Sequence, residues 1–265
     1  MKKLFLLCAA LLLSLTQARA DEGMWLLKLM KQQHLEDSLR KAGLQLPPEA
    51  LYSETSSSLR ECIGIFGGGC TGEVVSPEGL VLTNHHCGFS YVHEMSAIGH
   101  DYMKDGYFAH NRSEELRTPA SLGFTFVLRI TDVTKEVNTE AKKKKADEFT
   151  RQSMGFLEPL AEKMLKKSEY AKKKGMRARI VPYFGGNQFY LFYEQTFQDV
   201  RLVANPPYNI GQFGGNTDNW MWPRHNADFC MFRIYADKNG EPAPYSKDNV
   251  PLKVKKYLPI SLKGM

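Results

Sequence analysis

The chain contains a succession of short apolar runs that are rich in β-branched residues and bounded by turn residues. Runs of this length are typical of strands, and the turn residues between them predict antiparallel connections. The runs occupy residues 62–66, 72–75, 80–83, 124–130, 179–184, 188–193, 200–204 and 228–235. This spacing predicts a mainly β fold, a barrel or a sandwich, and not alternating β-α units.

Two other segments have a helical pattern. Residues 23–43 carry apolar side chains at close to the helical period, which predicts one amphipathic helix. Residues 132–175 are polar, rich in lysine and almost free of glycine, which predicts a helical insertion between strands. We interpret the lysine runs at 142–145 and 172–174 as solvated helix faces, because such runs are normally surface features.

Residues 1–20 have the pattern of a secretory signal. Lys2 and Lys3 precede an apolar stretch at residues 4–15, and small residues at Ala18 and Ala20 form a cleavage site. This stretch is too short for a membrane span, which needs about 20 apolar residues, and no later segment approaches that length. The sequence therefore predicts an exported protein that begins at Asp21 and has no membrane span.

The charge balance gives little support to nucleic-acid binding. The whole chain has 35 basic and 29 acidic side chains, but removal of the signal leaves 32 basic against the same 29 acidic. A nucleic-acid interface requires a clustered basic face, whereas the lysines here are interleaved with glutamates on one predicted helical segment. We expect no nucleic-acid partner.

Four cysteines remain after the signal: Cys62, Cys70, Cys87 and Cys230. In an oxidising compartment an even number of cysteines predicts disulfides, and three connectivities are formally available. A bridge from Cys70 to Cys87 would hold the strand end that carries two histidines. The pairing of Cys62 with Cys230 stays open.

The segment with the clearest chemistry is residues 67–87, where a glycine-rich turn and a second strand end in His85, His86 and Cys87. An imidazole held beside a disulfide suits a general base, which must meet its nucleophile in one tautomer. Zinc binding is the first alternative, but no ligand pair has the usual spacing. A histidine pair with a purely structural role is the second alternative.

A second dense segment, residues 213–229, combines tryptophans, asparagines and aspartates. Aromatic walls beside polar groups are typical of a recognition site, although core aromatics and turn aspartates would explain the composition equally well. Asp228 leads into a predicted strand, where its carboxylate could accept the Nδ1 proton of a catalytic histidine. Asp132, which follows another strand, is the competing candidate for that role.

Together these segments resemble the exported serine dipeptidyl-peptidases of Gram-negative bacteria, of the types called dipeptidyl-peptidase 7 and dipeptidyl-peptidase 11. The resemblance covers the whole mature chain in order. It rests on four blocks: residues 21–27 (DEGMWLL), 67–70 (GGGC), 83–87 (TNHHC) and 218–225 (DNWMWPRH).

The resemblance implies a chymotrypsin-like double β-barrel with an added helical domain. Residues 21–265 would be the N-terminal part of the catalytic domain, containing the first barrel. The activity implied is release of dipeptides from peptides with a free N-terminus, without metal or cofactor, in the periplasm and by a homodimer. By motif position, His86 would be the general base, Asp228 its orienting partner, and Asn219 and Trp220 part of the site that binds the substrate's α-amino group.

The nucleophilic serine of such an enzyme is expected outside this sequence. A chymotrypsin-like serine lies in a Gly-x-Ser-Gly turn beside an oxyanion hole. None of Ser76, Ser90, Ser153 and Ser261 has that context. We therefore expect this chain alone to be inactive; the alternative is a noncatalytic secreted peptide-binding barrel or a decayed peptidase. The sequence does not discriminate between acidic and hydrophobic selectivity at the P1 position of the substrate.

Overall fold

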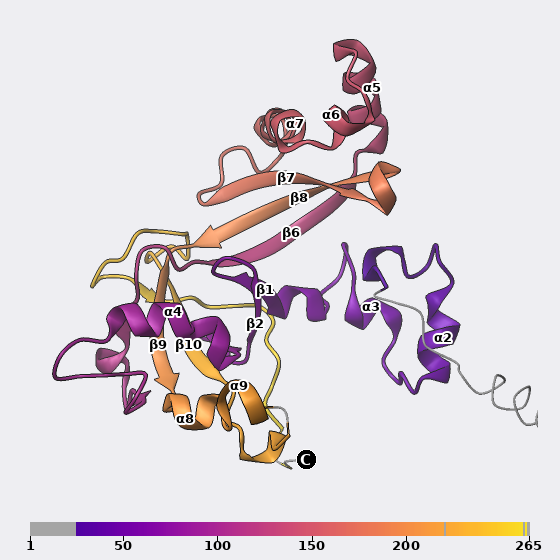
Figure 1. The fold of residues 1–265 in the computed structure, drawn as a ribbon. Helices are drawn as coiled ribbons and strands as arrows, with labels where there is room; N and C mark the ends of the chain where they lie inside the picture. Colours follow the sequence, from indigo (N-terminus) through magenta and orange to yellow (C-terminus); the bar gives the residue numbers. More distant parts are fainter. Residues whose placement is uncertain (1–24, 220, 262, 264–265) are drawn as a thin grey trace, which may run out of the picture. The chain divides into compact units, whose positions relative to one another are not determined.

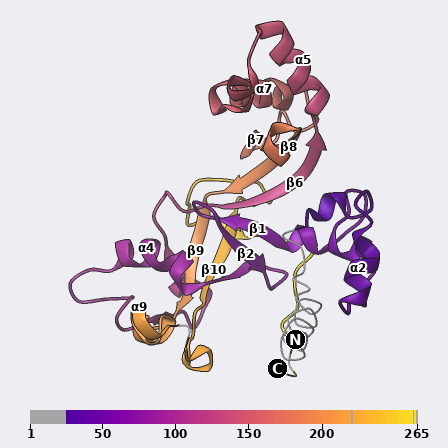
Figure 2. The same ribbon diagram turned by 45° about the vertical axis from the view of Figure 1, so that its right-hand side comes forward.

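The computed structural model describes residues 25–219, 221–261 and 263 (Figures 1 and 2). The chain divides into two compact units, residues 1–52 and residues 53–265. The predicted signal at residues 1–20 and Trp220 of the predicted recognition site lie outside the described residues.

The described part of the first unit, from residue 25 onward, contains short helical segments. These are η1 (Leu27–Leu29), α2 (Leu35–Lys41) and α3 (Pro48–Leu51). The prediction of one continuous helix over residues 23–43 is therefore wrong. His34, directly before α2, has a left-handed backbone with φ of 52°, and this conformation interrupts a right-handed helix. Pro48 opens α3 at a position where a missing N–H costs nothing.

The second unit is built on an antiparallel sheet with the strand order β4-β9-β10-β3-β2-β1-β6-β8-β7 in its described part; β5 pairs with β9 and β11 with β10. The strands are β1 (Ile63–Phe66), β2 (Cys70–Val74), β3 (Leu80–Thr83), β4 (Tyr107–Phe108), β5 (Leu116–Arg117), β6 (Phe124–Asp132), β7 (Met176–Tyr183), β8 (Gln188–Phe197), β9 (Asp199–Asn205), β10 (Cys230–Ala236) and β11 (Val250–Pro251). The predicted mainly β fold is confirmed. Each predicted run overlaps one of these strands, whereas β4, β5 and β11 were not predicted because two residues are too few to form a pattern.

The sheet curls around one apolar core. Its buried members come from strands that are distant in the pairing order, which requires that the inner faces of these strands meet. They include Phe66, Val81, Phe124, Leu202 and Phe232, each at most 1% exposed. Along β1, β3 and the first part of β10, buried side chains alternate with more exposed neighbours, as one buried face requires.

Three helices lie between β6 and β7: α5 (Thr134–Lys144), α6 (Glu148–Gln152) and α7 (Met154–Lys166). They pack with the extended parts of β7 and β8 around a second apolar cluster, separate from the first, in which Val137, Ala161 and Phe189 are fully buried (Figure 1). All the lysines at 142–145 and 172–174 are exposed, as predicted. Those at 142–145 lie at the C-terminal end of α5, whereas those at 172–174 lie in a turn before β7 and not on a helix face as predicted.

The remaining helices surround the end of the sheet at which β3 finishes and β10 begins. They are α4 (His85–Met95), α8 (Tyr208–Gly211) and α9 (Gly215–Asp218), together with the short segments η2 (Leu59–Cys62), η3 (Arg112–Glu114), η4 (Phe184–Gly186) and η5 (Pro223–His225) elsewhere in the unit. Helix α4 starts two residues after β3 ends and carries the predicted catalytic histidine. This junction positions the site.

Candidate active site

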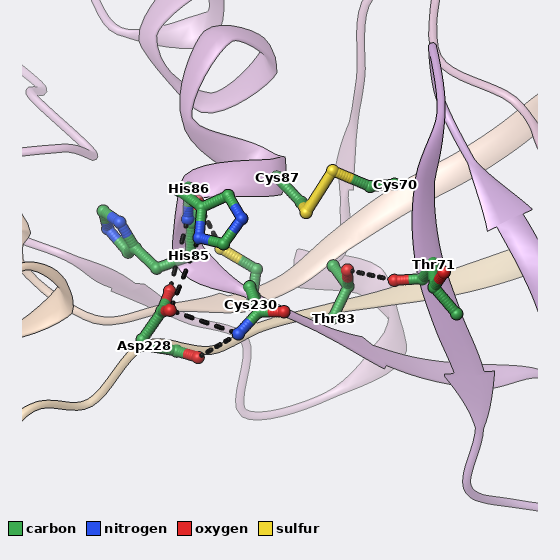
Figure 3. Close-up of a disulfide and its surroundings, with 9 residues drawn as sticks. Cys70, Thr71, Thr83, His85, His86, Cys87, Asp228 and Cys230 are labelled. Atoms are coloured by element: carbon green, nitrogen blue, oxygen red, sulfur yellow. Dashed lines mark hydrogen bonds and ion pairs between the residues drawn. A yellow bond between two sulfur atoms is a disulfide. The ribbon is translucent and has the colours of Figure 1, made fainter. Parts of the chain in front are cut away.

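The two histidines lie in the first turn of helix α4 and not at the end of a strand. Asn84, with extended backbone, occupies the N-cap position, and His85 is the first helical residue. A disulfide joins Cys87 in the same turn to Cys70 at the start of β2, with the two Cα atoms 6.0 Å apart (Figure 3). The first turn of α4 is therefore covalently attached to the sheet.

His86 and Asp228 lie side by side, although 142 residues separate them in sequence. In the antiparallel pairing of β3 with β10, Thr83 is opposite Cys230. The residues that follow β3 therefore meet the residues that precede β10. Nδ1 of His86 is 3.4 Å from Oδ2 of Asp228, and the backbone N–H of His86 donates to Oδ1 of Asp228 at 3.4 Å (Figure 3).

The two members of this pair differ in exposure. The imidazole of His86 is 68% exposed, whereas the carboxylate of Asp228 is 23% exposed. This arrangement suits general-base chemistry, in which a carboxylate faces Nδ1 while the imidazole remains accessible to a reacting group.

His85 has a different environment from its neighbour. Its ring points away from that of His86 (Figure 3) and is 1% exposed. It packs against Gly211 at the end of α8. Burial lowers the pKa of His85, so its ring is neutral at neutral pH. The structural interpretation of the histidine pair therefore fits His85.

Three possible zinc ligands lie close together in the structure. The possible ligand atoms of Cys70, His86 and Cys87 lie within 4.8 Å of one another. Cysteine binds zinc as a thiolate, however, and both sulfur atoms are joined in the disulfide. While the disulfide is formed, the imidazole of His86 is the one member of this group of three that can bind a metal ion.

The other two cysteines that the structure describes, Cys62 and Cys230, are buried free thiols, so the open question of a bridge between them is answered in the negative. Sγ of Cys230 donates to Oδ1 of Asn205 at 2.8 Å. Burial raises the pKa of the Cys230 thiol, which keeps it protonated. Cys230 thus packs beneath the site as an uncharged group.

The predicted recognition segment is braced by the side chain of Asn226. Nδ2 of Asn226 donates to Oδ1 of Asn219, and Oδ1 of Asn226 accepts from the backbone N–H of Phe213 at 3.3 Å. Asn219 follows α9, and its side chain is partly buried. One amide therefore ties together both ends of the loop that carries Asn219.

Asp132, the competing carboxylate, has a different role. Its Oδ1 accepts from the backbone N–H of Thr134 at 2.9 Å and from the Thr134 hydroxyl at 2.6 Å, where β6 ends and α5 begins. This is the geometry of a local turn that starts a helix. Of the two candidate carboxylates, Asp228 is the one that the structure brings to His86.

Sequence reasoning missed Asn84. Its side-chain Nδ2 donates to Oδ2 of Asp228 at 3.1 Å and to the backbone oxygen of Asp228 at 3.4 Å. An asparagine followed by a helical segment is a recognised start signal, and it would have revealed α4. It would not have revealed the contact with Asp228, which depends on strand pairing.

Comparison with known proteins identifies the family. The sequence profile described as Peptidase S46 matches residues 20–265. The chain belongs to the peptidase S46 family. The resemblance found from the sequence blocks is thus confirmed.

Relatives within the peptidase S46 family carry specific names. The chain is 53% identical to dipeptidyl-peptidase 7 of Phocaeicola vulgatus and 45% identical to the Asp/Glu-specific dipeptidyl-peptidase of Porphyromonas gingivalis. In both comparisons it is covered completely but spans only 37% of the relative's length.

A solved structure has the same fold. The crystal structure of Porphyromonas endodontalis DPP11 in complex with the dipeptide Arg-Glu matches with a TM-score of 0.85 and 43% sequence identity. The match covers 93% of this chain and 35% of that chain. Among the residues that the structure describes, no helix is both long and apolar enough to cross a membrane.

Proposed function

We propose that this chain contributes the general base and its orienting carboxylate to a serine dipeptidyl-peptidase, which releases dipeptides from the free N-terminus of peptides by acyl-enzyme chemistry. The observation that carries the proposal is the pairing of His86 Nδ1 with Asp228 Oδ2 at 3.4 Å, on a helix attached to the sheet by a disulfide. Membership of a peptidase family supports it.

In this mechanism Nε2 of His86 removes the proton of a serine hydroxyl as that oxygen attacks the scissile carbonyl. The imidazolium that forms is stabilised by the carboxylate of Asp228, which also keeps the Nδ1–H tautomer in place. His86 then returns the proton to the leaving amine, and water completes the cycle by hydrolysing the acyl-enzyme.

The nucleophilic serine would come from another part of the full-length protein. The S46 relatives are longer than this chain, which spans 37% of their length. We expect the isolated chain to be unable to hydrolyse peptides, because no residue here supplies the attacking oxygen in an oxyanion-hole turn.

Recognition of the substrate's α-amino group would involve Asn219 and Trp220. A desolvated ammonium needs oxygen acceptors, and the side-chain oxygen of Asn219 is one. The bond from Asn226 orients the Asn219 amide so that its position does not depend on substrate. This requirement would limit the enzyme to free N-termini. Export to the periplasm and a homodimeric assembly belong to the same proposal.

The test uses the full-length protein and dipeptidyl reporters that release a fluorescent amine. Reporters with acidic and with hydrophobic residues before the scissile bond should both be offered, each with a free and with an acetylated N-terminus. We expect cleavage of free forms only, and Asp228→Asn should lower kcat by about 10⁴-fold, the effect of losing the correct histidine tautomer.

The control substitution is Asp132→Asn, which changes a carboxylate that serves a local turn. It should leave kcat unchanged, whereas His86→Ala should abolish turnover. Full activity in folded His86→Ala, or loss of activity in Asp132→Asn alone, would contradict the assignment.

A further inference from the structure

Asn84 occupies the N-cap of α4 without capping the helix. An asparagine at this position normally accepts a hydrogen bond from a backbone N–H of the first turn through its side-chain oxygen. Asn84 makes no such bond. In the same chain, Asn111 behaves normally, because its Oδ1 accepts from the backbone N–H of Ser113 at 3.0 Å at the start of η3.

The side chain of Asn84 is directed at Asp228 instead. Its Nδ2 donates to the carboxylate Oδ2 at 3.1 Å and to the backbone oxygen of the same residue at 3.4 Å. One amide group thus binds both the main chain and the side chain of Asp228. The pairing of Thr83 with Cys230 places the two residues together, because each lies just beyond the end of its strand.

Asp228 takes over the capping role. Its Oδ1 accepts from the backbone N–H of His86 in the first turn of α4, at 3.4 Å. A carboxylate at a helix N-terminus is stabilised by the free N–H groups and by the helix dipole. The cap and the orienting group of the catalytic histidine are therefore one carboxylate.

The two donors determine how the carboxylate is turned. A carboxylate held through only one oxygen can rotate about its terminal torsion, which is broad for aspartate. Here the His86 N–H holds Oδ1 and the Asn84 amide holds Oδ2, the oxygen that faces Nδ1 of the imidazole. Rotation of the carboxylate would break both bonds.

We infer that Asn84 is a positioning residue, which aligns the Asp228 carboxylate with the imidazole of His86 by binding Oδ2. This inference rests on the proposed function for its effect on turnover, but not for its effect on the histidine tautomer. The neutral amide suits the role because it donates without competing for the Nδ1 proton.

The decisive variants place at position 84 a residue that is favourable at a helix N-cap but lacks the amide donor. Asn84→Ser introduces a side chain that caps helices as well as asparagine does but is too short to reproduce the amide's reach. Asn84→Asp keeps the shape and the capping ability but replaces the donor by a second carboxylate. The matched control is Asn111→Ser, at an N-cap whose asparagine caps η3 and donates to Oε1 of Glu114.

Two measurements are made on the full-length protein. We expect kcat for reporter cleavage to fall about 10- to 100-fold in Asn84→Ser, with KM unchanged, as for loss of a hydrogen bond to a charged group. Asn84→Asp should lose more. Nitrogen-15 spectra of ring-labelled histidine should show that His86 changes from the Nδ1–H tautomer to a mixture, while Asn111→Ser keeps the wild-type value in both measurements.

The outcomes separate the inference from the proposed function. Wild-type kcat and tautomer in both Asn84 variants would overturn the inference, as would equal losses in Asn84→Ser and Asn111→Ser. A wild-type protein that cleaves no reporter would contradict the proposed function, and the tautomer measurement would still test Asn84. If Asn84→Ser does not fold, kcat and the His86 tautomer in Asn84→Asp decide the question.

Discussion

Gly211, the last residue of α8, provides the sharpest stability test of the packing beneath the site. A Cβ built on Gly211 would lie 2.4 Å from Cδ2, 2.5 Å from Cγ and 2.6 Å from Nε2 of His85. Carbon atoms in favourable contact are about 3.5 to 4.0 Å apart, so either the ring or the helix must move. We expect Gly211→Ala to destabilise the fold.

The expected loss of stability depends on how far the His85 ring or helix α8 can move to make room for the added methyl group. The His85 ring is 1% exposed and lies one residue from the N-cap of α4, whose first turn is attached to the sheet by the disulfide. Overpacking of this kind costs about 1 to 3 kcal/mol. For a domain of this size the cost corresponds to a melting temperature lower by about 2 to 12 °C.

The assay is thermal unfolding of the chain followed by far-ultraviolet circular dichroism. Gly155→Ala is the matched control, because Gly155 lies in α7 and an added Cβ meets nothing within 4 Å. Removing that helical glycine should stabilise by about 0.5 to 1 kcal/mol. The cost of Gly211→Ala should largely disappear in a His85→Ala background. A Gly211→Ala chain that melts like the wild type, or an undiminished cost in that background, would refute the reasoning.

Two further predictions concern the same region. Burial lowers the pKa of His85, so as the pH falls the unfolded chain takes up a proton at this residue before the folded chain does. The difference in unfolding free energy between wild type and His85→Gln should therefore be complete above pH 6.5 and decrease below it, by at most about 1.4 kcal/mol per pH unit. A constant difference in urea midpoints between pH 5 and 8 would disprove this. Reduction of the Cys70–Cys87 disulfide, which closes a loop of 17 residues, should lower the free energy of unfolding by about 3 kcal/mol. A reductant that shifts the midpoint of the double serine variant equally would show that the effect lies elsewhere.

The longer strands could be predicted from the sequence because each one is indicated by residues that are adjacent along the chain. Short apolar runs bounded by turn residues identified β1, β3 and β10. Helix α4 was missed because its first turn, with two histidines, a cysteine and a glycine, continues a strand without a polar loop. The single helix predicted over residues 23–43 failed at His34, whose left-handed backbone leaves no trace in the apolar period.

Part of the candidate site could likewise be predicted from the sequence, and part depended on the tertiary structure. The residue types alone indicated a base at His85 or His86 and two carboxylates, Asp132 and Asp228, that could orient it; the choice of His86 came from the resemblance to the family. The choice between the carboxylates depended on motif resemblance. The structure supports Asp228 because the pairing of β3 with β10 brings it next to His86. Nothing in the sequence near Asn84 reveals that its amide serves Asp228, because the contact spans 144 residues.

The sequence by itself determined where the strands of four or more residues lie, which histidine adjoins a cysteine, and which family the chain resembles, since these are properties of neighbouring residues. Only the tertiary structure decided that one histidine is buried and neutral while the next is exposed and paired. Consecutive residues at the start of a helix point in different directions, and the surroundings that each one meets are supplied by strands and loops far along the chain.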